Sequence, residues 1–77
     1  MRIKYDQEAD AVYIYLREAP CAYGRNLDDH RRIDYASDNK PIGIELLCVS
    51  RGVDPYDLPE QNEVISILEQ NRIKVFA

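Results

Sequence analysis

Ile42-Gly43-Ile44-Glu45-Leu46-Leu47-Cys48-Val49 is the stretch of this 77-residue chain that decides its fold. Successive side chains of a β-strand point to opposite faces, so this run divides into two sets. The expected core face carries Ile42, Ile44, Leu46 and Cys48, and the opposite face carries Gly43, Glu45, Leu47 and Val49. Pro41 cannot donate a hydrogen bond to a neighbouring strand, so it is expected at the start of this strand.

The rest of the first half repeats short alternating runs separated by turn residues, which is typical of an antiparallel meander. The pattern predicts further strands at residues 2–5, 11–16, 22–27 and 31–35. Gly24 is expected to mark a β-bulge, because glycine inside a strand often does. Asn39 is the residue expected at positive φ in the turn before Pro41.

The pattern changes near the C-terminus, where Asp57-Leu58-Pro59-Glu60 combines an N-cap residue, an early proline and a glutamate three residues after the cap. A helix is therefore predicted to begin at Asp57. It is expected to end at Asn71, because asparagine tolerates the left-handed backbone conformation that often ends a helix. Its apolar stripe consists of Val64, Ile65, Ile67 and Leu68. Residues 73–76 alternate again and predict a short last strand, at a sheet edge or across a dimer.

These elements predict a single α+β domain over residues 1–77. Its architecture is a five- or six-stranded, mostly antiparallel meander sheet with one C-terminal amphipathic helix packed on one face. A chain of this length buries only about 60% of the surface that its unfolded form exposes. A homodimer is therefore the default expectation, because a second copy would cover further apolar area.

Composition disfavours several kinds of partner. The formal net charge of −4 opposes binding to nucleic acid, and Asp28, Asp29 and Asp34 lie among the clustered Arg25, Arg31 and Arg32. The N-terminus has no apolar signal segment and no run approaches the length of a membrane helix, so we expect a cytoplasmic protein that binds no membrane.

Cofactor-binding patterns are also missing from the sequence. Cys21 and Cys48 lack C-x-x-C spacing and the chain has a single histidine, His30, in a polar turn, so no zinc site and no cofactor are expected. Both cysteines are interpreted as small hydrophobic fillers in a reducing compartment.

Two stretches resemble a family of small prokaryotic proteins called domain of unknown function 2283. The first is Ile3-Lys4-Tyr5-Asp6-Gln7-Glu8-Ala9-Asp10-Ala11-Val12-Tyr13-Ile14, and the second joins Ile33-Asp34-Tyr35 to Ile42-Gly43-Ile44-Glu45-Leu46-Leu47. Asn39 stands where a turn glycine is expected in that family. The resemblance implies membership without an established activity, and it permits an antitoxin-like role beside a small partner protein.

The candidate site residues are Tyr13, Tyr15, Arg32, Asp34 and Glu45, which gather on the sheet face opposite the helix if the strands pair in order. Tyrosines on a one-layer sheet are typical of a protein–protein surface, since they give large contact area at low entropic cost. On this interpretation, Arg32 and Glu45 form a cross-strand or inter-subunit ion pair. Two carboxylates and two phenols beside an arginine could also perform acid–base chemistry.

Asp6, Glu8 and Asp10 stand at every second position and suggest a site for a hard cation. The calcium-loop template fails, because Ala11 and Arg17 replace its turn glycine and its bidentate glutamate. Turn formation by the aspartates is the favoured interpretation. The alternative function is a small metal-dependent hydrolase or nuclease that uses Asp6, Glu8, Asp10, Asp34 and Glu45.

Overall fold

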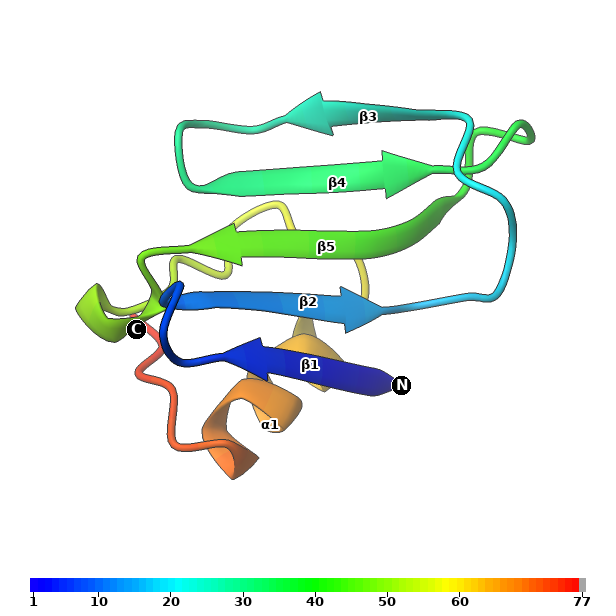
Figure 1. Ribbon diagram of the computed structural model, residues 1–77. Helices are drawn as coiled ribbons and strands as arrows, with labels where there is room; N and C mark the ends of the chain where they lie inside the picture. Colours follow the sequence, from blue (N-terminus) through cyan, green and yellow to red (C-terminus); the bar gives the residue numbers. More distant parts are fainter. Residues whose placement is uncertain (77) are drawn as a thin grey trace.

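The computed structural model describes residues 1–76, which form an open five-stranded sheet with one α-helix behind it (Figure 1). All neighbouring strands are antiparallel, which confirms the predicted α+β class. In these residues no helix is long and apolar enough to cross a membrane. The elements in chain order are β1 (Arg2–Asp6), β2 (Ala11–Tyr15), β3 (Tyr23–Asn26), β4 (Arg31–Tyr35), β5 (Pro41–Leu47), the 3-10 helix η1 (Val49–Arg51) and α1 (Gln61–Gln70).

The sheet order is β1-β2-β5-β4-β3, so the most apolar strand, β5, lies at the centre. The chain leaves β2 along one end of the sheet, forms β3 at the far edge, and returns through β4 to β5 (Figure 1). β2 and β3 are therefore not neighbours, although they follow each other in the sequence. Instead, β2 and β4 lie on either side of β5, which places their side chains two strands apart.

The core lies between the sheet and the segment that follows it. Figure 1 looks onto the sheet with the residues 53–60 connection and α1 behind the strands. The stripe of α1 is confirmed at Val64 and Leu68, which are fully buried, whereas Ile65 and Ile67 are half-buried. The principal core cluster consists of Val12, Ile14, Ile44, Leu46, Val49, Val53, Leu58, Val64, Leu68 and Ile73.

The predicted N-cap of the helix was wrong by three residues. Asp57 lies instead in the turn that joins Pro55 to Leu58, at φ 62°. The N-cap position is occupied by Glu60 at φ 50°, and α1 begins at Gln61. The buried Leu58 side chain accounts for the difference, because the chain turns sharply to insert it into the core before the helix can begin.

The helix ends in a Schellman motif. The amide of Arg72 donates to Glu69 O at 3.0 Å and the amide of Ile73 donates to Leu68 O at 3.0 Å. Asn71 is the C-cap residue as expected, but its φ is −96°, and Arg72 takes the left-handed conformation at φ 60°. Leu68 and Ile73 are both buried in the core, which supplies the apolar contact that usually accompanies this motif.

Three smaller expectations are settled by the backbone. Asn39 has φ 65°, as predicted for the turn before β5. Gly24 does not mark a bulge, because the irregularity lies in the pairing of β4 with β5 at Asp34 and Tyr35. The predicted last strand is reduced to a single parallel bridge between Val75 and Val53, so it extends neither edge of the sheet.

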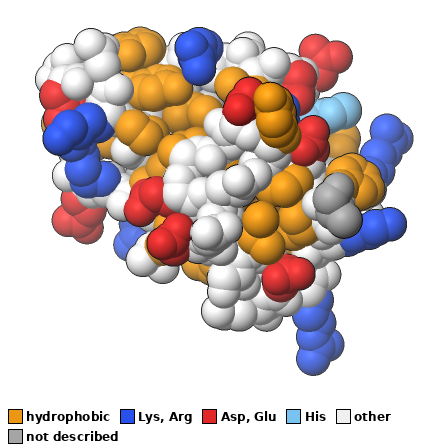
Figure 2. All heavy atoms as spheres, turned by 180° about the vertical axis from the view of Figure 1, so that it is seen from behind, with side chains coloured by type: hydrophobic (Ala, Val, Ile, Leu, Met, Phe, Trp, Pro, Cys, Tyr) orange, Lys and Arg blue, Asp and Glu red, His pale blue; other side chains and the backbone are white. Residues whose placement is uncertain are grey.

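Figure 2 shows the back of the molecule, where hydrophobic side chains alternate with charged ones and arginine and lysine side chains project at the margins. Arg31 connects this side to the sheet, because its Nη1 donates to Asp54 O at 3.1 Å and to Tyr56 O at 2.6 Å. Arg32 follows it in β4 and points to the opposite face. The predicted basic cluster is thus divided between two faces of the sheet.

Candidate functional site

The sheet face opposite α1, called the open face below, is built from aligned positions on all five strands. Strand pairing places Arg2, Tyr15, Gly43, Asp34 and Gly24 in one row across the sheet. A second row consists of Lys4, Tyr13, Glu45, Arg32 and Asn26. All five predicted site residues therefore lie on one face, and Asp34 has a glycine on each side.

Tyr13 crosses the sheet above Gly43 to reach Asp34. Its hydroxyl donates a hydrogen bond to Asp34 Oδ2 at 2.7 Å, although the two residues lie on strands separated by β5. A Cβ atom on Gly43 would collide with the phenol ring, so only glycine leaves room for this geometry. Burial and the bond to the Asp34 carboxylate both raise the pKa of Tyr13, so the phenol stays protonated and acts as a fixed donor.

Arg32 approaches Asp34 from the other side in the same manner. Its guanidinium lies above Gly24, where a Cβ atom would collide with it, and Nε donates to Asp34 Oδ1 at 3.1 Å. Its Nη1 atom donates to Asn26 Oδ1 at 3.4 Å. Both carboxylate oxygens of Asp34 therefore accept hydrogen bonds from side chains that lie flat on the sheet.

The predicted cross-strand ion pair between Arg32 and Glu45 does not form within the chain. The two residues are direct cross-strand neighbours, yet the guanidinium pairs with Asp34 instead. The space above Gly24 explains the choice, because it allows the arginine side chain to turn away from β5. Among the described residues, the Glu45 carboxylate has no ion-pair partner.

Tyr15 completes the aromatic part of the open face. Its ring lies 4.8 Å from that of Tyr13, measured between centroids, with the planes tilted by 59°. The Arg2 guanidinium stacks over the Tyr15 ring at 4.2 Å from its centroid, which is a cation–π geometry. Arg2 and Lys4 from the edge strand therefore belong to this face. Their alternation with Ile3 and Tyr5 was the only sequence signal that could have placed them there.

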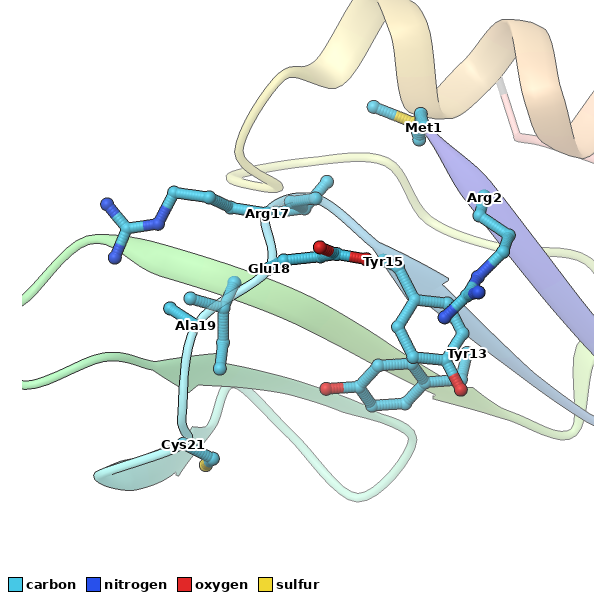
Figure 3. Close-up of a pocket in the computed structure, with 10 residues that line it drawn as sticks. Met1, Arg2, Tyr13, Tyr15, Arg17, Glu18, Ala19 and Cys21 are labelled. Atoms are coloured by element: carbon cyan, nitrogen blue, oxygen red, sulfur yellow. The ribbon is translucent and has the colours of Figure 1, made fainter.

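A hollow of about 640 Å³ opens beside the two tyrosines, at the end of the sheet where β2 leaves it (Figure 3). Tyr13, Tyr15 and Arg2 form one wall, and the connection that contains Arg17 and Cys21 forms the other (Figure 3). A smaller hollow of about 100 Å³ lies on the same face between Lys4, Tyr13 and Glu45. The open face is therefore an uneven surface with aromatic walls.

The five carboxylates of the hydrolase alternative do not form one cluster. Asp6 and Asp10 belong to the turn between β1 and β2, where Asp6 Oδ1 accepts the Ala9 amide at 3.0 Å. Asp10 Oδ2 accepts the Ser50 hydroxyl at 2.6 Å, and its Oδ1 accepts the Ser50 amide at 2.9 Å. In residues 1–76 no three acidic, histidine or cysteine side chains are placed to hold a metal ion.

The remaining reactive residues stand apart from one another. Cys21 is exposed and Cys48 is half-buried, and both are free thiols, so Cys21 is not the buried filler that the sequence suggested. Cys48 lies at φ 54° directly after β5, where the chain turns into η1. His30 is exposed in the β3–β4 turn, where its amide donates to Asp28 Oδ1 at 2.9 Å.

An open antiparallel sheet with one helix behind it and an ordered tyrosine face in front defines a small α+β domain with a β-sheet surface. The chain belongs to the family described as protein of unknown function (DUF2283), whose model matches residues 2–50. The match contains all five strands and hence the whole open face, and it ends before α1. Neither the curated proteins nor the solved structures that were compared with the chain gave a match.

Proposed function

We infer that the chain is a protein-interaction module that binds a second copy or a small partner protein through the open face. The observation that carries this inference is the fixed placement of Tyr13 and Tyr15 on a sheet face that α1 leaves uncovered. Tyrosines contribute much of the energy of protein interfaces, and side chains ordered in advance lose little entropy on binding. The bond from Tyr13 to Asp34 and the stacking of Arg2 on Tyr15 provide that order.

The same geometry argues against acid–base chemistry on this face. The Asp34 carboxylate accepts hydrogen bonds from both Tyr13 and Arg32, which occupy its two oxygens. A general base needs an oxygen within reach of a substrate proton. The interaction module is therefore favoured over the metal-dependent hydrolase or nuclease, whose carboxylates are dispersed over the sheet and its turns.

The most specific form of the proposal is an antitoxin-like component of a two-protein system, in which the partner covers the open face. Copurification of the tagged chain from its native host, followed by mass spectrometry, tests this form. The expected result is one small protein at equal stoichiometry, or a second copy of the chain alone. Recovery of neither from the wild type at physiological salt would contradict the proposal.

A substitution on the open face tests the surface itself. Tyr15→Ala should abolish association, measured by size-exclusion chromatography with light scattering, because it removes a central aromatic contact. Tyr56→Ala is the matched control, since Tyr56 is 66% exposed on the connection behind the sheet. Equal association of both variants with the partner or second copy would contradict the assignment of this face.

A further inference from the structure

Two opposite charges flank Tyr13 on the open face without meeting. Lys4 on β1 and Glu45 on β5 are each the direct cross-strand neighbour of Tyr13 on β2, and all three line the smaller hollow. Among the described residues, neither charge forms an ion pair, although Asp28, Asp34 and Asp38 each pair with an arginine. The two unpaired charges are arranged symmetrically about β2.

This arrangement is self-complementary. Neighbouring strands lie about 4.8 Å apart, so Lys4 and Glu45 stand at nearly equal distances on either side of β2. A two-fold axis that runs along β2, parallel to the sheet, exchanges its two sides between facing copies. We propose that the open face binds a second copy of this chain about that axis, with Lys4 of each copy paired with Glu45 of the other. This inference rests on the proposed function and names its partner.

Other symmetric arrangements place like charges together. An axis along β5 sets Glu45 against its own symmetry mate, and an axis across the strands through Tyr13 sets Lys4 against its mate. Like-charge contacts oppose association. An axis across the strands between this row and the next would pair Lys4 with Asp6, but that carboxylate already accepts the Ala9 amide at 3.0 Å. The axis along β2 is the one that pairs both unused charges.

The apolar contacts agree with the same axis. It places Tyr13 and Tyr15 at the centre of the interface, each opposite its own mate, where aromatic residues contribute most. Leu47, which is 39% exposed on the open face, lies toward its margin. Two sheets that pack face to face lie about 10 Å apart with their side chains interdigitated, so the dimer would bury both tyrosines in a sandwich. A standard interface of about 800 Å² per copy is a modest part of the 5175 Å² surface.

Charge reversal tests the axis. Lys4→Glu and Glu45→Lys should each raise the dimer dissociation constant at least about tenfold, because each change creates two repulsive contacts. An equimolar mixture of these two variants should restore dimers, since every contact in the mixed dimer joins opposite charges. The measurement is sedimentation equilibrium, with circular dichroism to confirm that each variant is folded. Glu69→Lys on the exposed side of α1 makes the same charge change and should leave the dissociation constant unchanged.

The outcomes separate this inference from the proposed function. A wild-type dimer that Tyr15→Ala dissociates, but that neither charge reversal weakens, would overturn the axis and leave the interaction surface in place. Lys4→Glu could also form dimers again when mixed with Asp6→Lys but not when mixed with Glu45→Lys. This result would overturn the axis along β2 in favour of the axis across the strands. A wild type that stays monomeric at millimolar concentration would overturn the second copy as partner. If Tyr15→Ala then also left the copurified set of proteins unchanged, the proposed function itself would fail.

Discussion

Tyr13 and Asp34 lie on strands separated by β5 and are joined across it by a hydrogen bond of 2.7 Å from the phenol to the carboxylate. The bond spans two strand spacings, so it connects the β1–β2 half of the sheet to the β3–β4 half on the side that has no helix. It also determines where the aromatic surface lies, because the Tyr13 ring can rest on β5 only above Gly43.

Tyr13→Phe should lower the free energy of unfolding by about 1.5–3 kcal/mol, which is the usual range for a hydrogen bond to a charged acceptor. Urea denaturation measures this change. Tyr15→Phe is the matched control, because the Tyr15 hydroxyl makes no hydrogen bond with the described residues. An equal loss of stability in both variants would show that the bond to Asp34 contributes nothing.

The difference in stability between the wild type and Tyr13→Phe should depend on pH. Burial, followed by the bond to Asp34, raises the Tyr13 pKa above its usual value near 10. A group whose pKa is raised on folding stabilises the fold fully below its unfolded pKa, and this contribution declines as the pH rises above it. The stability gap between the wild type and Tyr13→Phe should therefore be constant below about pH 10 and narrow above it. A gap that widens at alkaline pH would contradict the assignment.

Gly43→Ala should destabilise the protein by about 1–3 kcal/mol, because the added methyl group forces the Tyr13 ring off β5. The effect of Gly43→Ala should also depend on the residue at position 13. In a Tyr13→Ala background the same change should be neutral or stabilising, since alanine is otherwise favoured over glycine within a strand. Thermal unfolding of the four proteins in this cycle gives the coupling energy. Additive effects would show that the collision above Gly43 does not occur.

Much of this geometry follows from alternation in the sequence, and the rest depends on strand order. The two-residue period correctly placed Tyr13, Asp34 and Glu45 on one face, because each strand has a clear apolar side. It could not show that β5 inserts between β2 and β4, since pairing between distant strands depends on the whole core. Without that order, Gly43 could not be recognised as the floor beneath Tyr13.

The partner of the Arg32 side chain could not be predicted from alternation in the sequence either. Register alone makes Glu45 its neighbour, and only the space above Gly24 turns it toward Asp34. The helix start was likewise misplaced, because the burial of Leu58 prevailed over a favourable local capping pattern. Local sequence patterns therefore identified the elements and faces, while packing determined partners and boundaries.

Asp38 provides a test in acid. Two hydrogen bonds of 3.0 Å from Arg17, with a further bond from the Lys40 amide, lower the pKa of Asp38 from 3.8 to about 2. A carboxylate with a lowered folded-state pKa stabilises the fold above its unfolded pKa, and this contribution is lost as the pH falls toward the folded value. The melting temperatures of the wild type and Asp38→Asn should differ by a constant amount above about pH 4 and converge between pH 4 and pH 2.

The pair that joins Arg17 to Asp38 is exposed, so salt should weaken it. Arg17→Gln is the matched control, because it removes the partner of Asp38. It should therefore narrow the pH range over which the stabilisation by Asp38 is lost in acid. Retention of the full gap between the wild type and Asp38→Asn at pH 2 would contradict the assignment.

Arg72→Gly should stabilise the protein, which is unusual for a change that removes a whole side chain. Arg72 holds the left-handed position of the Schellman motif at φ 60°, where a residue with a Cβ atom is strained by about 1 kcal/mol and glycine is not. Its side chain is exposed and forms no ion pair with the described residues, so little packing is lost. A gain of this size should raise the melting temperature by about 4–8 °C in a domain of this length. Arg72→Ala is the control, because it removes the same atoms without relieving the backbone, and it should not stabilise. Equal melting temperatures for the glycine and alanine variants would contradict the assignment of backbone strain to this position.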